Sequence, residues 1–484
     1  MPFDYDLVII GGTAAARHAA IAARSWKARV ALVEPDLSEK LGPCAEDVFH
    51  YGLIQAAHTL QQTRQGSAFG LHWTNTEEGD RLSIHLNETR EWNQQLGDIL
   101  NASESPALLA SQGIDVIWGT GEFGRRPQLA FEVNGRRLRS RRYLIASGSR
   151  TVLPNIDGLY QAKPLTPESL WQATDLTKPP ANLIVIGSEP VAVEMAQTFA
   201  YLGSHVTLIV PHQTLLPHED ADASRLIQTQ LEVEGVRVIT RTEVSQVKQL
   251  DGKKWVQAGN QALETDEIVV AAQQQPQIKG LNLEAAGLLP LPNGLRVNAK
   301  LQTSHPRIYA AGGVLGGYPL AHIARYEALI AVRNALFFPF AQVNYRVIPW
   351  AVYTKPGLAR IGLTEMQARQ RYGDRILVHC QFVKRVAKAQ VHGETTGFCK
   401  LIGRLNGEIL GAHVVAPDAE EVMGAIALAM QQNCRIQSLA QVRAISPSYA
   451  DLIYQTAAGW QQQKRDRNIG LSYLLEDWFS WRRS

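Results

Sequence analysis

The sequence predicts an α/β protein, with two βαβ domains followed by a smaller α+β domain, and three observations lead to this fold class. An apolar run that turns at glycine into a helix-like segment occurs twice, as "LVIIGGTAAARHAA" from Leu7 and as "LIVIGSEPVAVEMA" from Leu183. Each copy is followed by a second apolar run, "ARVALVE" or "SHVTLIV". From "AQVNYRVIPW" onward, strand patterns precede the helix-like "DAEEVMGAIALAMQQN".

The repeated segments predict the central strands of two parallel sheets. Continuous apolar runs are typical of strands buried on both faces, and crossover helices cover parallel sheets in this way. Two such βαβ units imply two Rossmann-like domains of the nucleotide-binding type.

The segment between the repeats predicts short strands. "GRRPQLAFEVNGRRLRSRRYLIASGS" alternates in polarity, and Asn134-Gly135 within it is typical of a tight hairpin turn. The proline-rich "TKPPAN" indicates a boundary near residue 180.

Composition excludes several classes of protein. A chain of 484 residues has room for about three domains, and a formal net charge of +3 favours no nucleic-acid partner. The four cysteines lack paired or metal-ligand spacing, which fits a reducing compartment and predicts no metal site. No apolar run approaches the length of a membrane span, and the first one follows Asp4 and Asp6 rather than a basic region. We therefore expect a cytoplasmic protein.

Several stretches occur together in one order along the chain: "YDLVIIGG" with Glu34, "IASGSR", "LIVIGS" with "LGSHVTLIV", "IYAAGGV", and "GLARIGLTEMQA" with "GFCKLIG" and "ILGAHVV". In this order the chain resembles the pyridine nucleotide–disulfide oxidoreductases, the flavoprotein family of dihydrolipoamide dehydrogenase, glutathione reductase and mercuric reductase. The resemblance covers about residues 4–460.

The resemblance implies a homodimeric FAD-dependent oxidoreductase and a domain order. We expect an FAD-binding-type domain at residues 1–150 and 271–342, with an NAD(P)-binding-like domain inserted at 151–270. A dimerisation domain at 343–460 and a tail at 461–484, rich in tryptophan and arginine, complete the expected chain.

The first nucleotide site keeps part of the pattern that holds FAD in the family. Its six fingerprint positions run from Gly11 to Ala16, with Thr13 at the position where the backbone should approach phosphate. Gly313 stands where the family has the aspartate that binds the ribityl chain. The resemblance predicts FAD contacts at ten positions: Gly11, Gly12, Thr13, Ala16, Glu34, Ala146, Ser147, Gly148, Gly312 and Gly313.

The second nucleotide site departs further from the pattern that binds NAD(P)H. Glu189 occupies the second-glycine position, and a like charge about 4 Å from a pyrophosphate costs roughly 4 kcal/mol. Val210 occupies the strand end that usually carries a ribose-binding residue, and residues 271–277 read "AAQQQPQ". We expect no conventional use of NAD(P)H.

The family's redox disulfide has the pattern C-x-x-x-x-C, and this chain has Cys44 followed by Phe49 at the second position. Leu53 replaces the family's lysine on the flavin side, while the position of its glutamate partner keeps Glu194. A buried carboxylate without that lysine should be neutral, solvated or paired differently. Cys44 is either a small buried residue or a reactive thiol.

The family's acid–base pair, H-P-x-x-x-E, reads Ser446-Pro447-Ser448-Tyr449-Ala450-Asp451. Serine does not titrate near neutral pH as imidazole does, so the base is lost together with the disulfide that it serves. We therefore expect that this chain is not a conventional disulfide reductase.

Three functions remain open: a flavoprotein oxidoreductase without a disulfide, a catalytically silent binding or regulatory scaffold, and an NAD(P)H-dependent oxidoreductase acting on a non-disulfide acceptor. His50 and Tyr51 are candidate proton donors or structural residues. The hairpin arginines form either a solvated face or a dock for an acidic electron-carrier protein; they are Arg125, Arg126, Arg136, Arg137, Arg139, Arg141 and Arg142. The tail's helically spaced apolar residues predict packing on the dimer, with membrane contact as an alternative; they are Leu471, Leu474, Leu475, Trp478 and Trp481.

Overall fold

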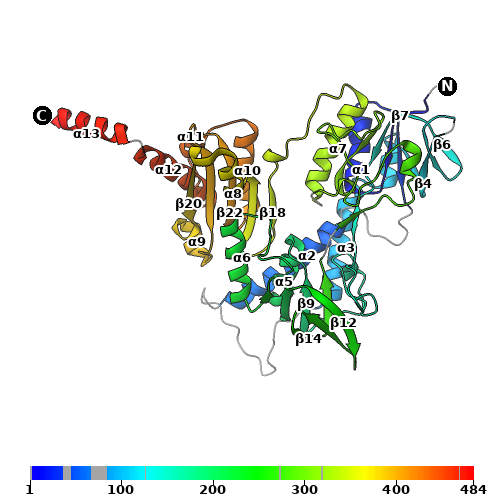
Figure 1. Ribbon diagram of the computed structural model, residues 1–484, viewed down its shortest axis with the longest axis horizontal. Helices are drawn as coiled ribbons and strands as arrows, with labels where there is room; N and C mark the ends of the chain where they lie inside the picture. Colours follow the sequence, from blue (N-terminus) through cyan, green and yellow to red (C-terminus); the bar gives the residue numbers. More distant parts are fainter. Residues whose placement is uncertain are drawn as a thin grey trace.

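A computed structural model describes residues 3–35, 45–66, 84–125, 127–271, 274–317, 320–467 and 469–483 (Figure 1). The first sheet is parallel, and its central strand is the first apolar run of the sequence. Its order is β17 (Ile308–Ala310), β7 (Ser140–Ile145), β1 (Tyr5–Ile10), β2 (Val30–Glu34) and β3 (Asp115–Trp118).

Alternation along β1 explains why both faces of this sheet are buried. Leu7 and Ile9 pack among alanines of α1 (Ala14–Ser25) and α7 (Ala321–Leu336), whereas Val8 and Ile10 pack on the opposite side. That opposite side is covered by an antiparallel sheet of β4 (Gly121–Gly124), β5 (Ala130–Val133) and β6 (Arg136–Leu138).

The predicted hairpin turn is confirmed. Asn134 and Gly135 connect β5 to β6 with φ angles of 48° and 72°, the left-handed values that a two-residue turn of this kind requires.

The second sheet repeats the first. It is parallel, with the order β11 (Arg237–Ile239), β10 (His205–Ile209), β9 (Asn182–Ile186) and β15 (Glu267–Val270). Helix α5 (Pro190–Tyr201) follows β9 as α1 follows β1. An antiparallel sheet covers one face; its strands are β12 (Val244–Leu250), β13 (Lys253–Ala258) and β14 (Gln261–Thr265).

The third sheet is antiparallel and belongs to the C-terminal region. Its order is β18 (Trp350–Val352), β19 (Gly357–Gly362), β22 (Ile409–Ala416), β21 (Phe398–Arg404) and β20 (Ile376–Phe382). The helices of this region are α8 (Glu365–Tyr372), α9 (Ala387–His392), α10 (Ala419–Gln431), α11 (Ile436–Gln441) and α12 (Asp451–Asp466). The predicted fold class, two Rossmann-like domains and an α+β domain, is confirmed.

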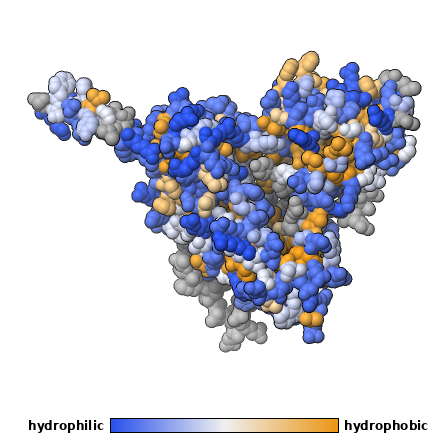
Figure 2. All heavy atoms as spheres, in the orientation of Figure 1, coloured by the Kyte–Doolittle hydropathy of each residue, from blue (hydrophilic) through white to orange (hydrophobic). Residues whose placement is uncertain are grey.

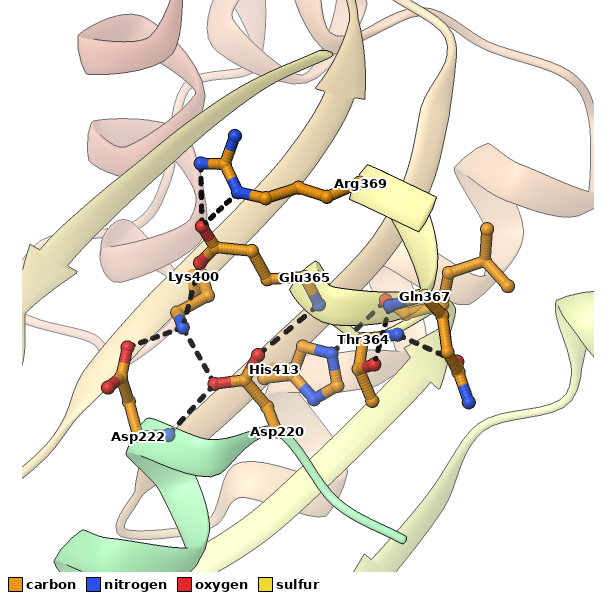
Figure 3. A network of polar contacts seen from close by, with 9 residues as sticks. Asp220, Asp222, Thr364, Glu365, Gln367, Arg369, Lys400 and His413 are labelled. Carbon is orange, nitrogen blue, oxygen red and sulfur yellow. Dashed lines mark hydrogen bonds and ion pairs between the residues drawn. The ribbon is translucent and has the colours of Figure 1, made fainter. Parts of the chain in front are cut away.

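Further contacts join these regions. Strands β8 (Ser149–Thr151) and β16 (Gln274–Pro276) pair antiparallel where the chain leaves and re-enters the first region. A polar network at Lys400 of β21, whose side chain is 4% exposed, joins the second region to the C-terminal sheet. Its Nζ lies 2.6 Å from carboxylate oxygens of both Asp220 and Asp222, at the start of α6 (Ala221–Val233), and 3.3 Å from Glu365 (Figure 3).

Between β2 and β3, the described residues form the helices α2 (Ala45–Arg64), α3 (Leu86–Ala102) and α4 (Pro106–Ser111). Helix α2 contributes Phe49, Leu53, Ala57 and Leu60 to the core that surrounds α5. This placement brings the segment after Cys44 against the second nucleotide-binding-type region.

Helix α13 (Ile469–Arg483) is the predicted tail helix, and it projects from the C-terminal region (Figure 1). Leu474, Trp478 and Trp481 are exposed in the single chain, where Figure 2 shows the tail standing clear of the body. The packing of this face on a second copy of the chain stays a prediction, and the side chain of Leu471 lies outside the described residues. Among the residues that the structure describes, no helix is both long and apolar enough to cross a membrane.

Candidate functional site

The turn after β1 is built as a dinucleotide site requires. Gly11 has a φ of 135°, and a Cβ there would lie 2.2 Å from the carbonyl oxygen of Ala146 on the neighbouring strand. Only glycine allows this approach, which places Gly12 and Thr13, both half-buried, ahead of the N-terminus of α1. Gly187 repeats the arrangement after β9, with a φ of 152°.

Thr13 uses its hydroxyl within the protein. Its Oγ1 donates a hydrogen bond of 2.8 Å to the Ala146 carbonyl oxygen and accepts one of 3.2 Å from the backbone N–H of Ala16. Thr13 is thus the N-cap of α1. Its methyl group stands 2.8 Å from the point where a Cβ on Gly148 would lie, so Gly148 leaves room for Thr13.

The carboxylate of Glu34 is occupied by Arg17 of α1. Arg17 Nε lies 2.7 Å from Oε1, and Nη2 lies 3.0 Å from Oε2. Glu34 is fully buried, and Arg17 Nη1 also donates to the Glu104 carbonyl oxygen at 3.2 Å. The end of β2, where a dinucleotide site presents a carboxylate to ribose, therefore holds an internal bidentate ion pair.

The flavin side of the expected site is closely packed. Gly312, with a φ of 79°, donates its N–H to Glu327 at 2.7 Å. A Cβ on Gly313 would lie 2.6 Å from the Ser149 hydroxyl, so an aspartate does not fit there without rearrangement. Ser147 Oγ donates to the Gln277 carbonyl oxygen at 2.6 Å.

These contacts test whether the residues present fit FAD. The glycine turn and the N-terminus of α1 fit a pyrophosphate, because free backbone N–H groups and the helix dipole favour an anion there. The end of β2 does not fit a ribose while Arg17 holds both oxygens of Glu34. The residues present therefore suit the pyrophosphate, whereas Glu34 is available to a ribose only after Arg17 moves from it.

The second nucleotide site presents the carboxylate of Glu189 where phosphate would approach. Exposed Glu189 is the N-cap of α5 and makes no side-chain capping bond. Buried Glu219 stands near it, with Arg360 Nε 3.5 Å away. Burial raises the pKa of Glu219 to about 7; Arg360 opposes this increase, whereas Asp220 and Glu189 add to it.

The remaining predicted features of this second site are apolar or lie outside the described residues. Val210 is fully buried after β10. In the segment 271–277, Ala271 is buried and Gln274 donates to Thr151 at 2.8 Å, whereas Ala272 and Gln273 fall outside the described residues.

The redox positions of α2 are part of a core. Phe49 is 5% exposed and Leu53 is 3% exposed, and both lie beside Leu86, Leu170 and Phe199. Phe49 and Leu53 are one helical turn apart, so they share the face of α2 that packs against this core. Cys44 lies outside the described residues.

Glu194 has a partner that sequence reasoning missed. Its Oε2 lies 2.6 Å from Nε2 of His50, and its Oε1 accepts a hydrogen bond of 2.7 Å from the backbone N–H of Tyr353. The Nδ1 atom of His50 is buried and has no hydrogen-bond partner among the described residues. Tyr51 packs edge-on against Tyr353, with ring centroids 4.5 Å apart. Of the three expected fates of Glu194, different pairing is the one observed.

Comparison with known proteins places the chain in a family. The model for pyridine nucleotide-disulphide oxidoreductases matches residues 5–328, and the model for their dimerisation domain matches residues 348–457. The mercuric reductase of Staphylococcus aureus is 32% identical over 446 residues, which cover 90% of this chain and 79% of that protein. A dihydrolipoyl dehydrogenase of Bacillus subtilis is 31% identical over 460 residues, covering 93% and 97%.

This chain belongs to the pyridine nucleotide–disulphide oxidoreductase family. Family members are FAD-dependent oxidoreductases with NAD(P)H as second substrate, and the match to the dimerisation domain indicates a homodimer.

Solved structures share the fold of this oxidoreductase family member. LpdA from Mycobacterium tuberculosis has a TM-score of 0.83 and 26% identity, covering 93% of this chain and 98% of its own. The HOCl-induced flavoprotein disulfide reductase RclA from Escherichia coli has a TM-score of 0.80 and 24% identity, with 94% and 99% covered, which shows the fold alone.

The family's C-terminal acid–base positions hold other contacts in this member. Ser446 is exposed in the single chain, and Asp451 accepts a hydrogen bond of 2.5 Å from Gln455 at the start of α12. Tyr449 between them is buried and donates to Glu394 at 3.1 Å.

The arginine hairpin of this family member is partly neutralised. Arg136 pairs with Asp115 at 2.8 Å, and Arg139 pairs with Asp4 at 2.9 Å. Arg137 lies 3.5 Å from Glu132 and donates to the Gln128 carbonyl oxygen. Arg125 and Arg141 are exposed, Arg142 is half-buried, and Arg126 lies outside the described residues. These pairs reduce the positive charge that the hairpin presents to solvent.

Proposed function

We propose that this chain is an FAD-binding flavoprotein oxidoreductase that works without a redox disulfide and without conventional use of NAD(P)H. The observation that carries the proposal is the core packing of Phe49 and Leu53, at the positions of the family's second sulfur and its lysine. A phenylalanine forms no disulfide, and its burial beside Phe199 supports a structural role for this part of α2.

Retention of FAD is supported by the family and by the turn at Gly11. Gly11, Gly12 and Thr13 with the N-terminus of α1 would hold the pyrophosphate, and Gly148 would lie on the flavin side. Bound FAD would supply electron transfer. His50, held by Glu194, would be a candidate proton donor on α2.

A donor other than NAD(P)H is supported by the second site. Exposed Glu189 at the N-terminus of α5 repels a pyrophosphate, and the side chain of Val210 offers no hydrogen bond to a ribose. An acidic electron-carrier protein at the arginine hairpin is the candidate donor, and the pairs at Arg136 and Arg139 reduce the charge available to attract it.

A catalytically silent scaffold is the second candidate function. The observation that favours it is the buried pair between Arg17 and Glu34, because this pair occupies the carboxylate that an adenosine ribose requires. The two candidates differ in one property, the binding of FAD.

The test is the absorbance spectrum of the purified full-length chain, before and after incubation with FAD. We expect yellow protein whose flavin is reduced by light with a sacrificial donor and is reduced slowly, if at all, by NADH or NADPH. We also expect no turnover of lipoamide, glutathione disulfide or Hg(II). Colourless protein that takes up no FAD would support the scaffold.

Two other outcomes would overturn the proposal in different ways. A thiolate–flavin charge-transfer band on anaerobic reduction would show that disulfide chemistry persists. Prompt bleaching by NADH or NADPH would show that the second site works despite Glu189, which would favour an NAD(P)H-dependent enzyme with a non-disulfide acceptor.

A further inference from the structure

The adenosine end of the first nucleotide site contains a buried arginine, Arg17, in addition to the glycine turn and the carboxylate of Glu34. Helix α1 is almost entirely alanine on its buried face, and Arg17 is the charged residue within that face. Its side chain is 5% exposed and that of Glu34 is 0% exposed. A cationic side chain is buried in such apolar surroundings only when it is paired with an anion, and Glu34 is that anion.

In this pair both oxygens of Glu34 are engaged and the carboxylate is fully buried. Arg17 uses Nε and Nη2 on the two separate oxygens of Glu34, which is the bidentate arrangement that makes the strongest arginine–carboxylate contact. Its third nitrogen, Nη1, donates to the Glu104 carbonyl oxygen, so the same guanidinium also holds the segment before α4. A ribose hydroxyl is a neutral donor and competes poorly with a buried guanidinium for these oxygens.

We propose that Arg17 is an internal latch on the adenosine end of the first site, which FAD must displace from Glu34 in order to bind fully. This inference rests on the proposed flavoprotein function and adds a residue that sets the cofactor's affinity. The pyrophosphate end remains open in the latched state, because Gly11 and the N-terminus of α1 take no part in the pair.

The test compares ligand binding to the wild-type chain and to Arg17→Met, which keeps the length of the side chain and removes the charge. Apoprotein would be titrated with FAD, with ADP as a probe of the adenosine end and with FMN as a probe lacking that end. We expect Arg17→Met to bind FAD and ADP at least tenfold more tightly than the wild type, with FMN unchanged.

The matched control is Arg24→Met on the same helix. Arg24 donates to the Gln112 carbonyl oxygen at 2.7 Å and makes no ion pair with Glu34, so its loss should leave all three affinities unchanged. Arg17→Met also leaves Glu34 buried without a cation, so the apoprotein should melt at a lower temperature than the wild type and recover when FAD is added. Arg17→Lys keeps the positive charge but cannot make the bidentate contact, so it should give an intermediate affinity. It is also a second variant if Arg17→Met fails to fold.

Two results would contradict the proposed role of Arg17, and they differ in what they imply for the flavoprotein function. Equal, measurable FAD affinities in the wild type and Arg17→Met would overturn the latch and leave the flavoprotein proposal intact. No saturable FAD binding by either chain would overturn the flavoprotein proposal together with the latch.

Discussion

His50 is the side-chain partner of Glu194 and lies three positions before Leu53 on α2. The backbone N–H of Tyr353 donates to the same carboxylate, so Glu194 links α2, α5 and the segment after β18. These two partners satisfy the buried carboxylate, so its presence in the core requires no catalytic role.

Replacing His50 tests whether the pair has this structural role. We expect His50→Ala to lower the free energy of unfolding by about 3 kcal/mol, because Glu194 loses its side-chain partner while it remains buried. His50→Gln retains a donor of similar reach and should lose less than half as much. Urea unfolding at neutral pH measures both, and equal losses in the two variants would show that the hydrogen bond contributes little.

Glu219 gives the protein a specific dependence on pH. Burial raises its pKa from the ordinary 4.5 to about 7, and both carboxylate oxygens lack a hydrogen-bond partner among the described residues. Folding therefore favours the protonated form: its contribution to stability is complete below about pH 4.5 and is lost as the pH rises through 7.

Glu219→Gln should remove this dependence. We expect the variant to be more stable than the wild type at pH 8 by about 3 kcal/mol, since each pKa unit corresponds to about 1.4 kcal/mol, and nearly equal to it at pH 4.5. Thermal unfolding of both chains across that range measures the difference. Glu189→Gln is the control: Glu189 is exposed and makes a smaller contribution than burial to the raised pKa of Glu219, so its loss should reduce the pH dependence only slightly. A constant difference between wild type and Glu219→Gln at all pH values would contradict the assignment.

At the scale of elements, α1 shows how one residue can serve the helix rather than a ligand. Thr13 caps the helix through Ala16 and ties it to β7 through the Ala146 carbonyl oxygen. A family glycine at this position would leave both bonds unmade. The Thr13 hydroxyl therefore anchors the start of α1 to β7.

Thr13→Ala should lower the free energy of unfolding by about 1 kcal/mol, the usual cost of losing a threonine cap. Thr13→Ser keeps the hydroxyl and removes only the methyl group near Gly148, so it should remain within a few tenths of a kcal/mol of the wild type. Chemical denaturation compares the three chains. A loss in Thr13→Ser as large as that in Thr13→Ala would assign the stabilisation to the methyl group instead.

The sequence predicts elements better than it predicts contacts between them. The continuous apolar runs at β1 and β9 and the Asn134-Gly135 turn depend on neighbours in the chain, so local patterns suffice for them. The contact between His50 and Glu194 joins residues 144 positions apart, and no local pattern encodes it. The sequence does contain a partial signal for the ion pairs of Arg17 and Lys400. Arg17 interrupts an alanine-rich helix, and Lys400 interrupts the apolar "GFCKLIG". A single cationic residue in an apolar run indicates a buried carboxylate elsewhere in the chain.

At the scale of the whole molecule, Lys400 joins the second nucleotide-binding-type region to the C-terminal sheet. Burial works against its charge, but hydrogen bonds to Asp220 and Asp222 prevail and raise the pKa of the ammonium group. Glu365 of α8 is the third carboxylate that pairs with Lys400, and it also pairs with Arg369 (Figure 3). The three carboxylates come from two regions, so the lysine holds their relative position in addition to satisfying its own charge.

Lys400→Met should therefore loosen the junction as well as destabilise the fold. We expect faster amide hydrogen exchange at the start of α6 and in β21, because Asp220 is left buried without its cation, whereas exchange in β1 and β2 should be unchanged. Lys254→Met is the matched control: Lys254 is also buried, and its partner Glu267 lies 2.5 Å away within the same region, so the control should destabilise that region without exposing β21. Identical exchange patterns in the two variants would contradict a role of Lys400 in joining the regions. The apolar core around Phe398 and Val415 would then hold the two regions together.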